Sequence, residues 1–363
     1  MSSDNSIAVK YAGAALKPAS RYIWQVRIWD SQGKVSRWSA KQTFVTGLGN
    51  DGWKAKWIVP PMSEASPLVR GTFKISRPVK SAIAYFTAHG VYEPFLNGGK
   101  VGEAFMAPGY TSYNHHLMYQ TYDVTSLIRR GENVLGAELA RGWYLGMMGW
   151  TNPEQYRSNF KEKEWAFLAQ IVITYKDGSQ EIVGTDGSWK TATGGVQHSA
   201  IYDGETFDAG SEVAGWSAAG FDASGWGPVK VADYGFDNLT PQQNEAVKTE
   251  QTVAAKELIV TPKGELVIDF GQNLVGSEVV DFTGHPGQKI TISHAEVLDE
   301  KGNFYTTNLR SAKAQSCYVC DGNPHKFTTR FTFYGFRYIK IEGIPQSEIN
   351  LDKFKAQVRF SAM

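Results

Sequence analysis

The stretch RYIWQVRIWD at residues 21–30 indicates the class of fold. Its period-2 alternation is typical of a β-strand, and the residues that share one face are Tyr22, Trp24, Val26 and Ile28. The tetrapeptide SQGK at 31–34 predicts a hairpin turn, and AKQTFVTG at 40–47 predicts the returning strand. The beginning of the chain is therefore predicted to be β-structure.

Leu16 and Tyr22 flank Pro18 in the segment LKPASRY. This spacing resembles the tyrosine corner of fibronectin type III or immunoglobulin-like sandwiches, in which the phenol bonds to upstream backbone. Such domains need about seven strands and roughly 100 residues, and far fewer residues precede GLGNDGW at 47–53. Residues 1–48 therefore predict the C-terminal part of a fibronectin type III-like domain. Either a preceding segment is missing, or another element covers its open face.

Residues 53–234 predict many short strands separated by turn signals, such as NGGK at 97–100 and KDGS at 176–179. This pattern is typical of a jelly-roll sandwich of the galactose-binding-like kind. One short helix is expected within residues 123–133, where Asp123 or Thr125 can cap it and Gly131 can end it.

Residues 243–363 predict a second β-sandwich, because GELVIDFGQNLVGSEVVDFTG at 264–284 and FTTRFTFYGFRYIKIEG at 327–343 both alternate like strands. His294 and Glu296 share a strand face in this block. They predict either an acid–base or ion-pair contact, or a pair at a domain interface. The expected fold class is thus all-β throughout.

The composition excludes several classes of protein. The 363 residues contain 37 Lys and Arg against 36 Asp and Glu, so a net charge of +1 predicts no nucleic-acid or anionic-membrane partner. No apolar run approaches membrane-spanning length. The two cysteines, Cys317 and Cys320, provide no disulfide framework and only half of a zinc site, so ordinary strand cysteines are expected and no metal is predicted.

Longer motifs point to a family. VYEPFLNGGKVGEAFMAPGYTSYNHHLMYQTYDVTSLIRRGENVLGAELARGWYLG at 91–146, followed by SAIYDGETFDAG at 199–210, resembles the N-terminal accessory domain of bacterial α-L-rhamnosidases. DFGQNLVGSEVVDFTGHPGQKITISHAEVLDEKGNFYTTNLR at 269–310 resembles the sandwich that follows in those enzymes. The resemblance implies carbohydrate partners, namely L-rhamnose or rhamnose-containing glycans. It also implies that hydrolysis belongs to a C-terminal (α/α)6 barrel, and the chain ends near where that barrel would begin.

The segment IYDGETFDAG at 201–210 places Asp203, Glu205 and Asp208 close together. A glycosidase needs two carboxylates about 5–9.5 Å apart, and Asp203 and Glu205 would lie about 6–7 Å apart on one strand face. Alternatively, the carboxylates accept backbone N–H bonds in a turn. Because the resemblance assigns the chemistry to the barrel, we expect no catalytic residue here and a structural or ligand-edge role for all three.

The loop RGWYLGMMGWTNPEQYRSNF at 141–160 is a candidate sugar-binding loop. Aromatic rings can stack on sugar C–H groups and polar side chains can bind hydroxyls; the candidates are Trp143, Tyr144, Asn152, Tyr156, Arg157 and Asn159. The alternative is aromatic core packing without a ligand. The resemblance also implies bridging calcium in some family members, but calcium needs six to eight oxygens, and VGEAFMAPGY at 101–110 offers only Glu103. No cofactor is therefore predicted.

Overall fold

The computed structural model describes residues 4–5, 9–61, 63–146 and 164–362. The chain divides into two compact units, Met1–Trp53 and Lys54–Met363. No helix among the described residues has the length and apolar character needed to cross a membrane.

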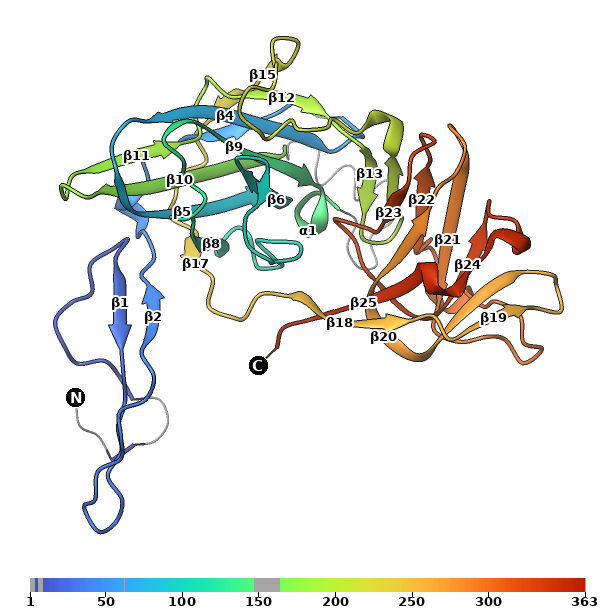
Figure 1. Cartoon of the computed structure of the whole chain (residues 1–363), viewed down its shortest axis with the longest axis horizontal. Helices are drawn as coiled ribbons and strands as arrows, with labels where there is room; N and C mark the ends of the chain where they lie inside the picture. Colours follow the sequence, from blue (N-terminus) through green and yellow to red (C-terminus); the bar gives the residue numbers. More distant parts are fainter. Residues whose placement is uncertain (1–3, 6–8, 62, 147–163, 363) are drawn as a thin grey trace. The chain divides into compact units, whose positions relative to one another are not determined.

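In the first unit, β1 (Arg21–Trp24) pairs antiparallel with β2 (Gln42–Val45) (Figure 1). The strand expected over 21–30 is shorter than predicted, because beyond Trp24 serine hydroxyls replace part of the ladder. The Ser39 hydroxyl accepts from the Val26 amide at 3.0 Å, and the Ser36 hydroxyl accepts from the Ile28 amide at 3.0 Å. The expected turn is present, with Gly33 at a φ of 78°.

The tyrosine corner predicted from Leu16, Pro18 and Tyr22 is also present. The Tyr22 hydroxyl accepts a hydrogen bond from the Lys17 amide at 2.7 Å. Its ring stacks on Phe44 of β2 with a centroid separation of 5.5 Å. The phenol thus fastens the segment before β1 to the hairpin.

The second unit begins with two sheets that face each other across one core (Figure 1). The seven-stranded sheet contains, in order, β16 (Lys230–Ala232), β3 (Trp57–Val59), β10 (Ala166–Tyr175), β5 (Val79–His89), β8 (Leu117–Asp123) and β17 (Leu239–Pro241), with β11 (Gln180–Gly184) on β10. The six-stranded sheet contains β15 (Gly227–Pro228), β12 (Lys190–Thr193), β4 (Pro67–Ile75), β9 (Gly131–Ala140), β6 (Val91–Leu96) and β7 (Gly99–Lys100). Inward residues such as Ile58, Phe86 and Phe167 are fully buried between them.

A ten-stranded sheet forms the rest of the second unit and encloses its own core. Its order is β13 (Val196–Ala200), β14 (Gly204–Asp208), β22 (Gln315–Val319), β21 (Lys289–Ala295), β24 (Tyr334–Glu342), β20 (Leu266–Phe282), β25 (Phe354–Phe360) and β18 (Lys248–Ala254), with β19 (Glu257–Val260) and β23 (His325–Phe327) on β20. The long strand β20 shifts register between Asp269 and Leu274. Strand β20 pairs with β24 up to Gly276, then with β25 up to Val280 and with β23 up to Phe282. The all-β fold class is confirmed.

The helix expected within residues 123–133 is absent, and that prediction was wrong. Strand β8 ends at Asp123 and β9 begins at Gly131, which leaves room for a single turn. The Leu127 amide donates to the Val124 carbonyl at 2.9 Å, and Asp123 caps this turn by accepting from the Thr125 amide at 3.1 Å. The α-helix found among the described residues is instead α1 (Gly142–Leu145).

Around IYDGETFDAG the chain leaves the six-stranded sheet and contributes β13 and β14 to the ten-stranded sheet. Strand β12 before them and β15 after them belong to the six-stranded sheet, but β14 pairs in parallel with β22 of the ten-stranded sheet. Glu205 lies beside Ser316 in this register. This segment was expected within residues 53–234, but it completes the sheet formed by residues 243–363.

Candidate functional site

Trp143 lies on α1, directly after the buried strand β9. Its ring is half-buried and lies between Tyr110 and Phe333, with a centroid separation of 6.3 Å to each. Tyr110 comes from the loop after β7, and Phe333 comes from the loop before β24. The candidate residue Trp143 thus lies where the two-sheet sandwich contacts the ten-stranded sheet.

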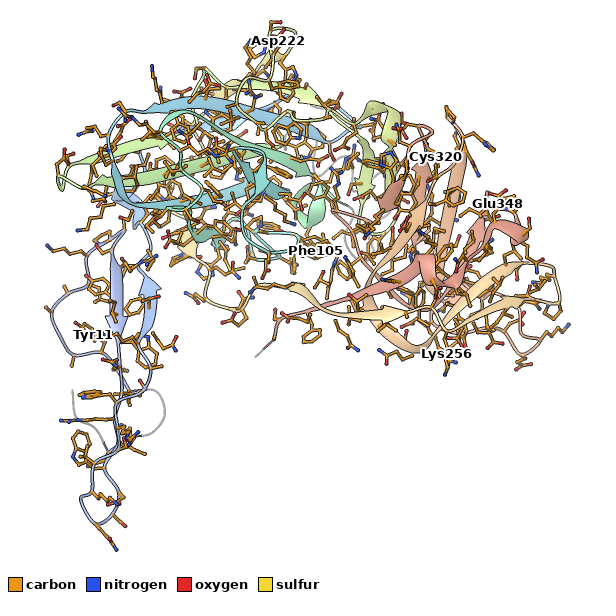
Figure 2. All side chains as sticks on the ribbon, viewed as in Figure 1. Tyr11, Phe105, Asp222, Lys256, Cys320 and Glu348 are labelled. Atoms are coloured by element: carbon orange, nitrogen blue, oxygen red, sulfur yellow. The ribbon has the colours of Figure 1, made fainter. Side chains whose placement is uncertain are left out.

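A groove runs beside Trp143. It consists of two adjoining cavities of about 190 Å³ and about 150 Å³. Both are lined by four residues: Phe105, Met106, Trp143 and Val247. The larger cavity adds Val275, Phe333 and Arg359. Figure 2 shows the side chain of Phe105, and its amide donates to the Val247 carbonyl at 2.8 Å, which holds it at this position. The groove is largely apolar, and one cationic side chain forms part of its wall.

Tyr144, the neighbour of Trp143, packs differently. Its ring stacks on His89 at a centroid separation of 4.5 Å and meets Tyr113 edge-on at 5.2 Å. Burial raises the pKa of its hydroxyl to about 12, with a further contribution from Tyr234. Tyr144 therefore takes part in an aromatic cluster, and it does not line the groove beside Trp143.

Glu103 projects into solvent near Lys248, whose ammonium lies 3.9 Å from its carboxylate. A neighbouring cation and high exposure do not suit a calcium ligand, because calcium takes several oxygens together. The described residues include no group of three or more His, Cys, Asp or Glu that could hold a metal ion. Glu103 thus does not fit the role of a calcium ligand. Asn152, Tyr156, Arg157 and Asn159 lie outside the described residues.

Glu205 is bound by backbone. It is 2% exposed, and its two oxygens accept from the amides of Arg330 at 2.9 Å and Phe331 at 2.8 Å. Burial raises its pKa to about 7, although these two hydrogen bonds oppose the shift. Such a pKa is typical of a general acid, but both oxygens accept backbone hydrogen bonds and the residue is almost fully buried. Glu205 fastens the loop between β23 and β24.

Asp203 and Asp208 lie on either side and are engaged separately. Asp203 is half-exposed and forms an ion pair with Lys313 at 3.5 Å. Asp208 caps the short turn Ala209–Ser211 by accepting from the Gly210 amide at 3.0 Å and the Ser211 hydroxyl at 2.8 Å. The structure thus does not bring the three carboxylates together around a common space.

A charge cluster that the sequence patterns did not indicate is centred on Arg330. The guanidinium of Arg330 donates to Glu138 of β9 at 2.8 Å and to Glu212 at 3.3 Å. Glu138 is fully buried, and its second oxygen has no partner among the described residues. Burial raises the pKa of Glu138 to about 7 against the opposing effect of Arg330. The one indication of this cluster in the sequence was Glu138 itself, a glutamate inside the apolar run VLGAELA at 134–140.

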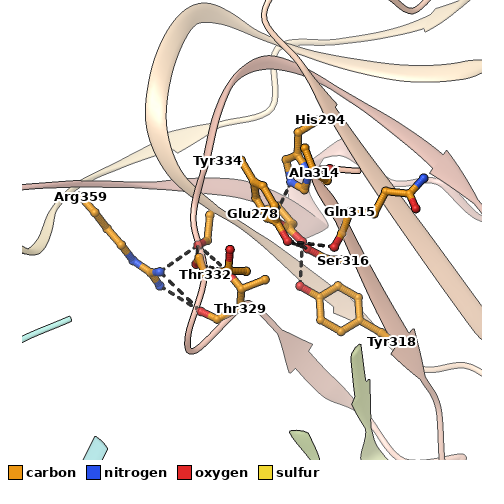
Figure 3. A network of polar contacts seen from close by, with 11 residues as sticks. Glu278, His294, Ala314, Gln315, Ser316, Tyr318, Thr329, Thr332, Tyr334 and Arg359 are labelled. Carbon is orange, nitrogen blue, oxygen red and sulfur yellow. Dashed lines mark hydrogen bonds and ion pairs between the residues drawn. The ribbon is translucent and has the colours of Figure 1, made fainter. Parts of the chain in front are cut away.

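A second buried network lies inside the ten-stranded sheet (Figure 3). Of the two alternatives for His294 and Glu296, the structure contradicts direct contact: His294 Nε2 lies 2.8 Å from Glu278 Oε2, and Glu296 accepts from Asn273. The Tyr318 hydroxyl donates to the other Glu278 oxygen at 2.7 Å. Burial by itself raises the pKa of Glu278. His294 and the hydrogen bonds to the carboxylate have a larger opposite effect, so the pKa falls to about 2. The pair is fully buried and has no access to a substrate.

Families of known proteins match nearly the whole chain. Residues 1–50 match the Rha78A-like, N-terminal immunoglobulin domain, residues 77–251 match the alpha-L-rhamnosidase N-terminal domain, and residues 259–360 match the bacterial alpha-L-rhamnosidase concanavalin-like domain. An alpha-L-rhamnosidase of Formosa agariphila is 35% identical over 96% of this chain and 39% of its own length. One of Streptomyces avermitilis is 40% identical over 79% of this chain and 28% of its own length.

Solved structures agree with these matches. The native rhamnosidase of Aspergillus terreus superimposes with a TM-score of 0.93 at 32% identity, covering 99% of this chain and 43% of that one. The Streptomyces avermitilis enzyme, solved with L-rhamnose, superimposes with a TM-score of 0.91 at 27% identity, covering 99% and 51%. The chain spans less than half of the length of the curated relatives described above. It therefore belongs to the α-L-rhamnosidase family and corresponds to the N-terminal β-rich region of that family.

Proposed function

We propose that this chain is the non-catalytic N-terminal region of an α-L-rhamnosidase-like glycoside hydrolase that acts on terminal α-L-rhamnosyl groups. In this proposal the chain supports or binds carbohydrate and does not hydrolyse it. The observation that carries the proposal is the half-buried Trp143 beside an apolar groove. An accessible indole face is the usual platform for the C–H groups of a sugar ring.

The contacts of the three carboxylates support the non-catalytic part of the proposal. A general acid or base must lie within hydrogen-bond reach of the substrate. Glu205 has both oxygens bound to backbone amides inside the protein, and Asp208 caps a turn. Asp203 is reachable by solvent, but its nearest described charge is Lys313.

Calorimetric titration with L-rhamnose tests the binding function. We expect heat at millimolar sugar, and we expect Trp143→Ala to abolish it. Trp29→Ala is the matched control, because Trp29 is 53% exposed and lies in the first unit. Repeating the titration with calcium and with a chelator tests the metal, and the proposal expects no difference. Absence of heat for the unaltered chain would contradict sugar binding.

A chromogenic α-L-rhamnoside tests the absence of hydrolysis. We expect no turnover by this chain. Turnover that Glu205→Gln abolishes would overturn the proposal and would make Glu205 a catalytic residue. Glu212→Gln serves as the control, because Glu212 contacts the same Arg330 from a more exposed position.

The parent protein is proposed to carry a C-terminal (α/α)6 catalytic domain as the partner of this chain. The domain boundaries also form part of the proposal: 1–48, 53–234 and 243–363, with β13 and β14 contributed to the third domain by the second. The alternative function is a stand-alone module that binds rhamnose or a plant polysaccharide. The gene sequence after residue 363 distinguishes the two, because an unrelated downstream domain would favour the alternative.

A further inference from the structure

Arg359 forms the cationic part of the groove wall. It is only 9% exposed, and its guanidinium lies 3.7 Å from the ring centroid of Phe105. It donates short hydrogen bonds to the Ser277 hydroxyl at 2.8 Å and to the Gln357 amide oxygen at 2.9 Å. Its contacts with the Thr329 carbonyl and the Thr249 hydroxyl are 3.4 to 3.5 Å long. These lengths lie beyond the usual range for N–H···O bonds, so the guanidinium retains donor capacity.

Among the described residues, the charge of Arg359 has no close counter-charge. Within the part of the chain that the structure describes, no carboxylate oxygen comes within 4.0 Å of this guanidinium. Glu278 is paired with His294, and Glu205 is bound by two backbone amides. Burial lowers the pKa of Arg359 to about 10, although Glu205 and Glu278 oppose the shift, so it remains a cation at neutral pH. A buried cation without an anionic partner is costly, and such groups are normally paired.

The remainder of the groove suits a flat, amphipathic molecule. Trp143, Phe333 and Phe105 supply aromatic surface around a cavity of about 190 Å³. The mouth is bordered by Val247 and Val275, which are 38% and 48% exposed. Aromatic faces for the ring of a sugar and one convergent charged group are the usual composition of a small-ligand site.

From this arrangement we infer that the groove between Trp143 and Arg359 binds an acidic sugar, a pyranose that carries a carboxylate, with its ring against the aromatic side chains and its carboxylate paired with Arg359. The inference rests on the proposed carbohydrate-binding function and adds the class of sugar. It requires a uronic acid residue in the glycan that the chain contacts. Arginine is well suited to this role, because its planar fork matches a carboxylate.

The test compares two probes that differ at one carbon. Methyl β-D-glucuronide and methyl β-D-glucoside are titrated into the chain in a calorimeter, and acetate is titrated as a carboxylate without a ring. We expect the glucuronide to bind roughly tenfold or more tightly than the glucoside, because one charge-assisted hydrogen bond accounts for such a ratio. We expect acetate to bind far more weakly than the glucuronide.

Variants assign the effect to Arg359. Arg359→Gln is expected to remove the preference for the glucuronide, and Arg359→Lys is expected to retain part of it. Arg337→Gln is the matched control, because Arg337 on β24 pairs with Asp269 and does not line the groove. Since Arg359→Gln removes a buried donor and can impair folding, a second pair is used. Val275→Asp puts a competing carboxylate at the mouth and is expected to abolish glucuronide binding, whereas Val275→Asn has a similar shape and is expected to spare it.

Each remaining outcome has one meaning. Equal affinity for the glucuronide and the glucoside, or an unchanged preference in Val275→Asp and Arg359→Gln, overturns the inference. Acetate that binds as tightly as the glucuronide overturns it too, since the site would then select any small anion. Titration with L-rhamnose separates the two claims: rhamnose binding without a glucuronide preference leaves the proposed function standing alone. Glucuronide binding without rhamnose binding contradicts only the neutral sugar specificity.

Discussion

The guanidinium of Arg330 donates to the carboxylate of Glu138 at 2.8 Å, and this bond joins a loop of the ten-stranded sheet to β9 of the six-stranded sheet. The same loop is held by Glu205 through the Arg330 and Phe331 amides. Two buried carboxylates therefore bind a single loop from opposite sandwiches. Glu93 lies opposite Glu138 on the adjacent strand β6 and adds to the excess of negative charge.

This cluster predicts that stability falls as pH rises from about 4.5 to about 7. Burial raises the pKa of Glu138 to about 7, so the folded chain binds more protons than the unfolded chain within that window. Each such group contributes a slope of up to about 1.4 kcal/mol per pH unit. Glu138→Gln is expected to flatten the dependence, as measured by urea unfolding at a series of pH values. Glu212→Gln should keep the slope, and an unchanged slope in Glu138→Gln would contradict the prediction.

The buried pair Glu278–His294 predicts the opposite pH dependence: its contribution to stability is lost as pH falls. Its contacts lower the pKa of Glu278 below that of an unfolded chain, so its contribution is present above about pH 4.5 and is lost as pH falls toward 2. Removing one partner of a buried pair costs about 3–5 kcal/mol. We expect Glu278→Gln to lower the free energy of unfolding by this amount at pH 7, and by much less at pH 3. Exposed Glu296→Gln is the control, and an equal loss at both pH values would refute the assignment.

Adding a methyl group at Gly204 is expected to destabilise the protein severely. The φ of Gly204 is 97°, and a Cβ would lie 1.7 Å from the Gln315 carbonyl oxygen, which belongs to the neighbouring strand β22. Gly204→Ala is therefore expected to disrupt the pairing of β14 with β22 and to lower the melting temperature strongly. Gly287→Ala shares the positive φ but meets nothing within 4 Å. Its cost should be only the backbone strain, about 1 kcal/mol. Similar melting temperatures for the two variants would contradict the steric argument.

The substitution Tyr22→Phe is expected to weaken the first unit locally. The substitution removes the hydrogen bond from the Lys17 amide, which is worth about 1 kcal/mol. The Lys17 amide should then exchange with solvent deuterium roughly fivefold faster, because 1 kcal/mol corresponds to about that ratio. Tyr11→Phe, at a ring that is 60% exposed, should leave this exchange rate unchanged. Equal rates in Tyr22→Phe and the unaltered chain would show that the corner contributes nothing.

Local patterns predicted local structure well. The alternation around Tyr22, the turn at Gly33 and the corner at Lys17 all depend on residues within a few positions of each other. The predicted helix at 123–133 failed for a physical reason: capping residues allow a helix to start, but β9 begins at Gly131 and leaves the chain no length to continue it.

Contacts between distant segments could not be predicted in this way. Period-2 alternation is the same whichever sheet a strand joins, so nothing in IYDGETFDAG indicated that β14 pairs with β22. The partner of His294 was missed because Glu278 is adjacent in space and sixteen positions away in the chain. Trp143 was singled out by residue type alone, and its groove requires Arg359 from the last strand.

The crossing of β13 and β14 has a consequence for how such proteins can evolve. A recombination event that exchanged residues 53–234 for a foreign module would remove two strands from the ten-stranded sheet and leave β22 without its neighbour. Loss of either sandwich alone would meet the same obstacle. The shared strands therefore favour inheritance of the two sandwiches as a pair.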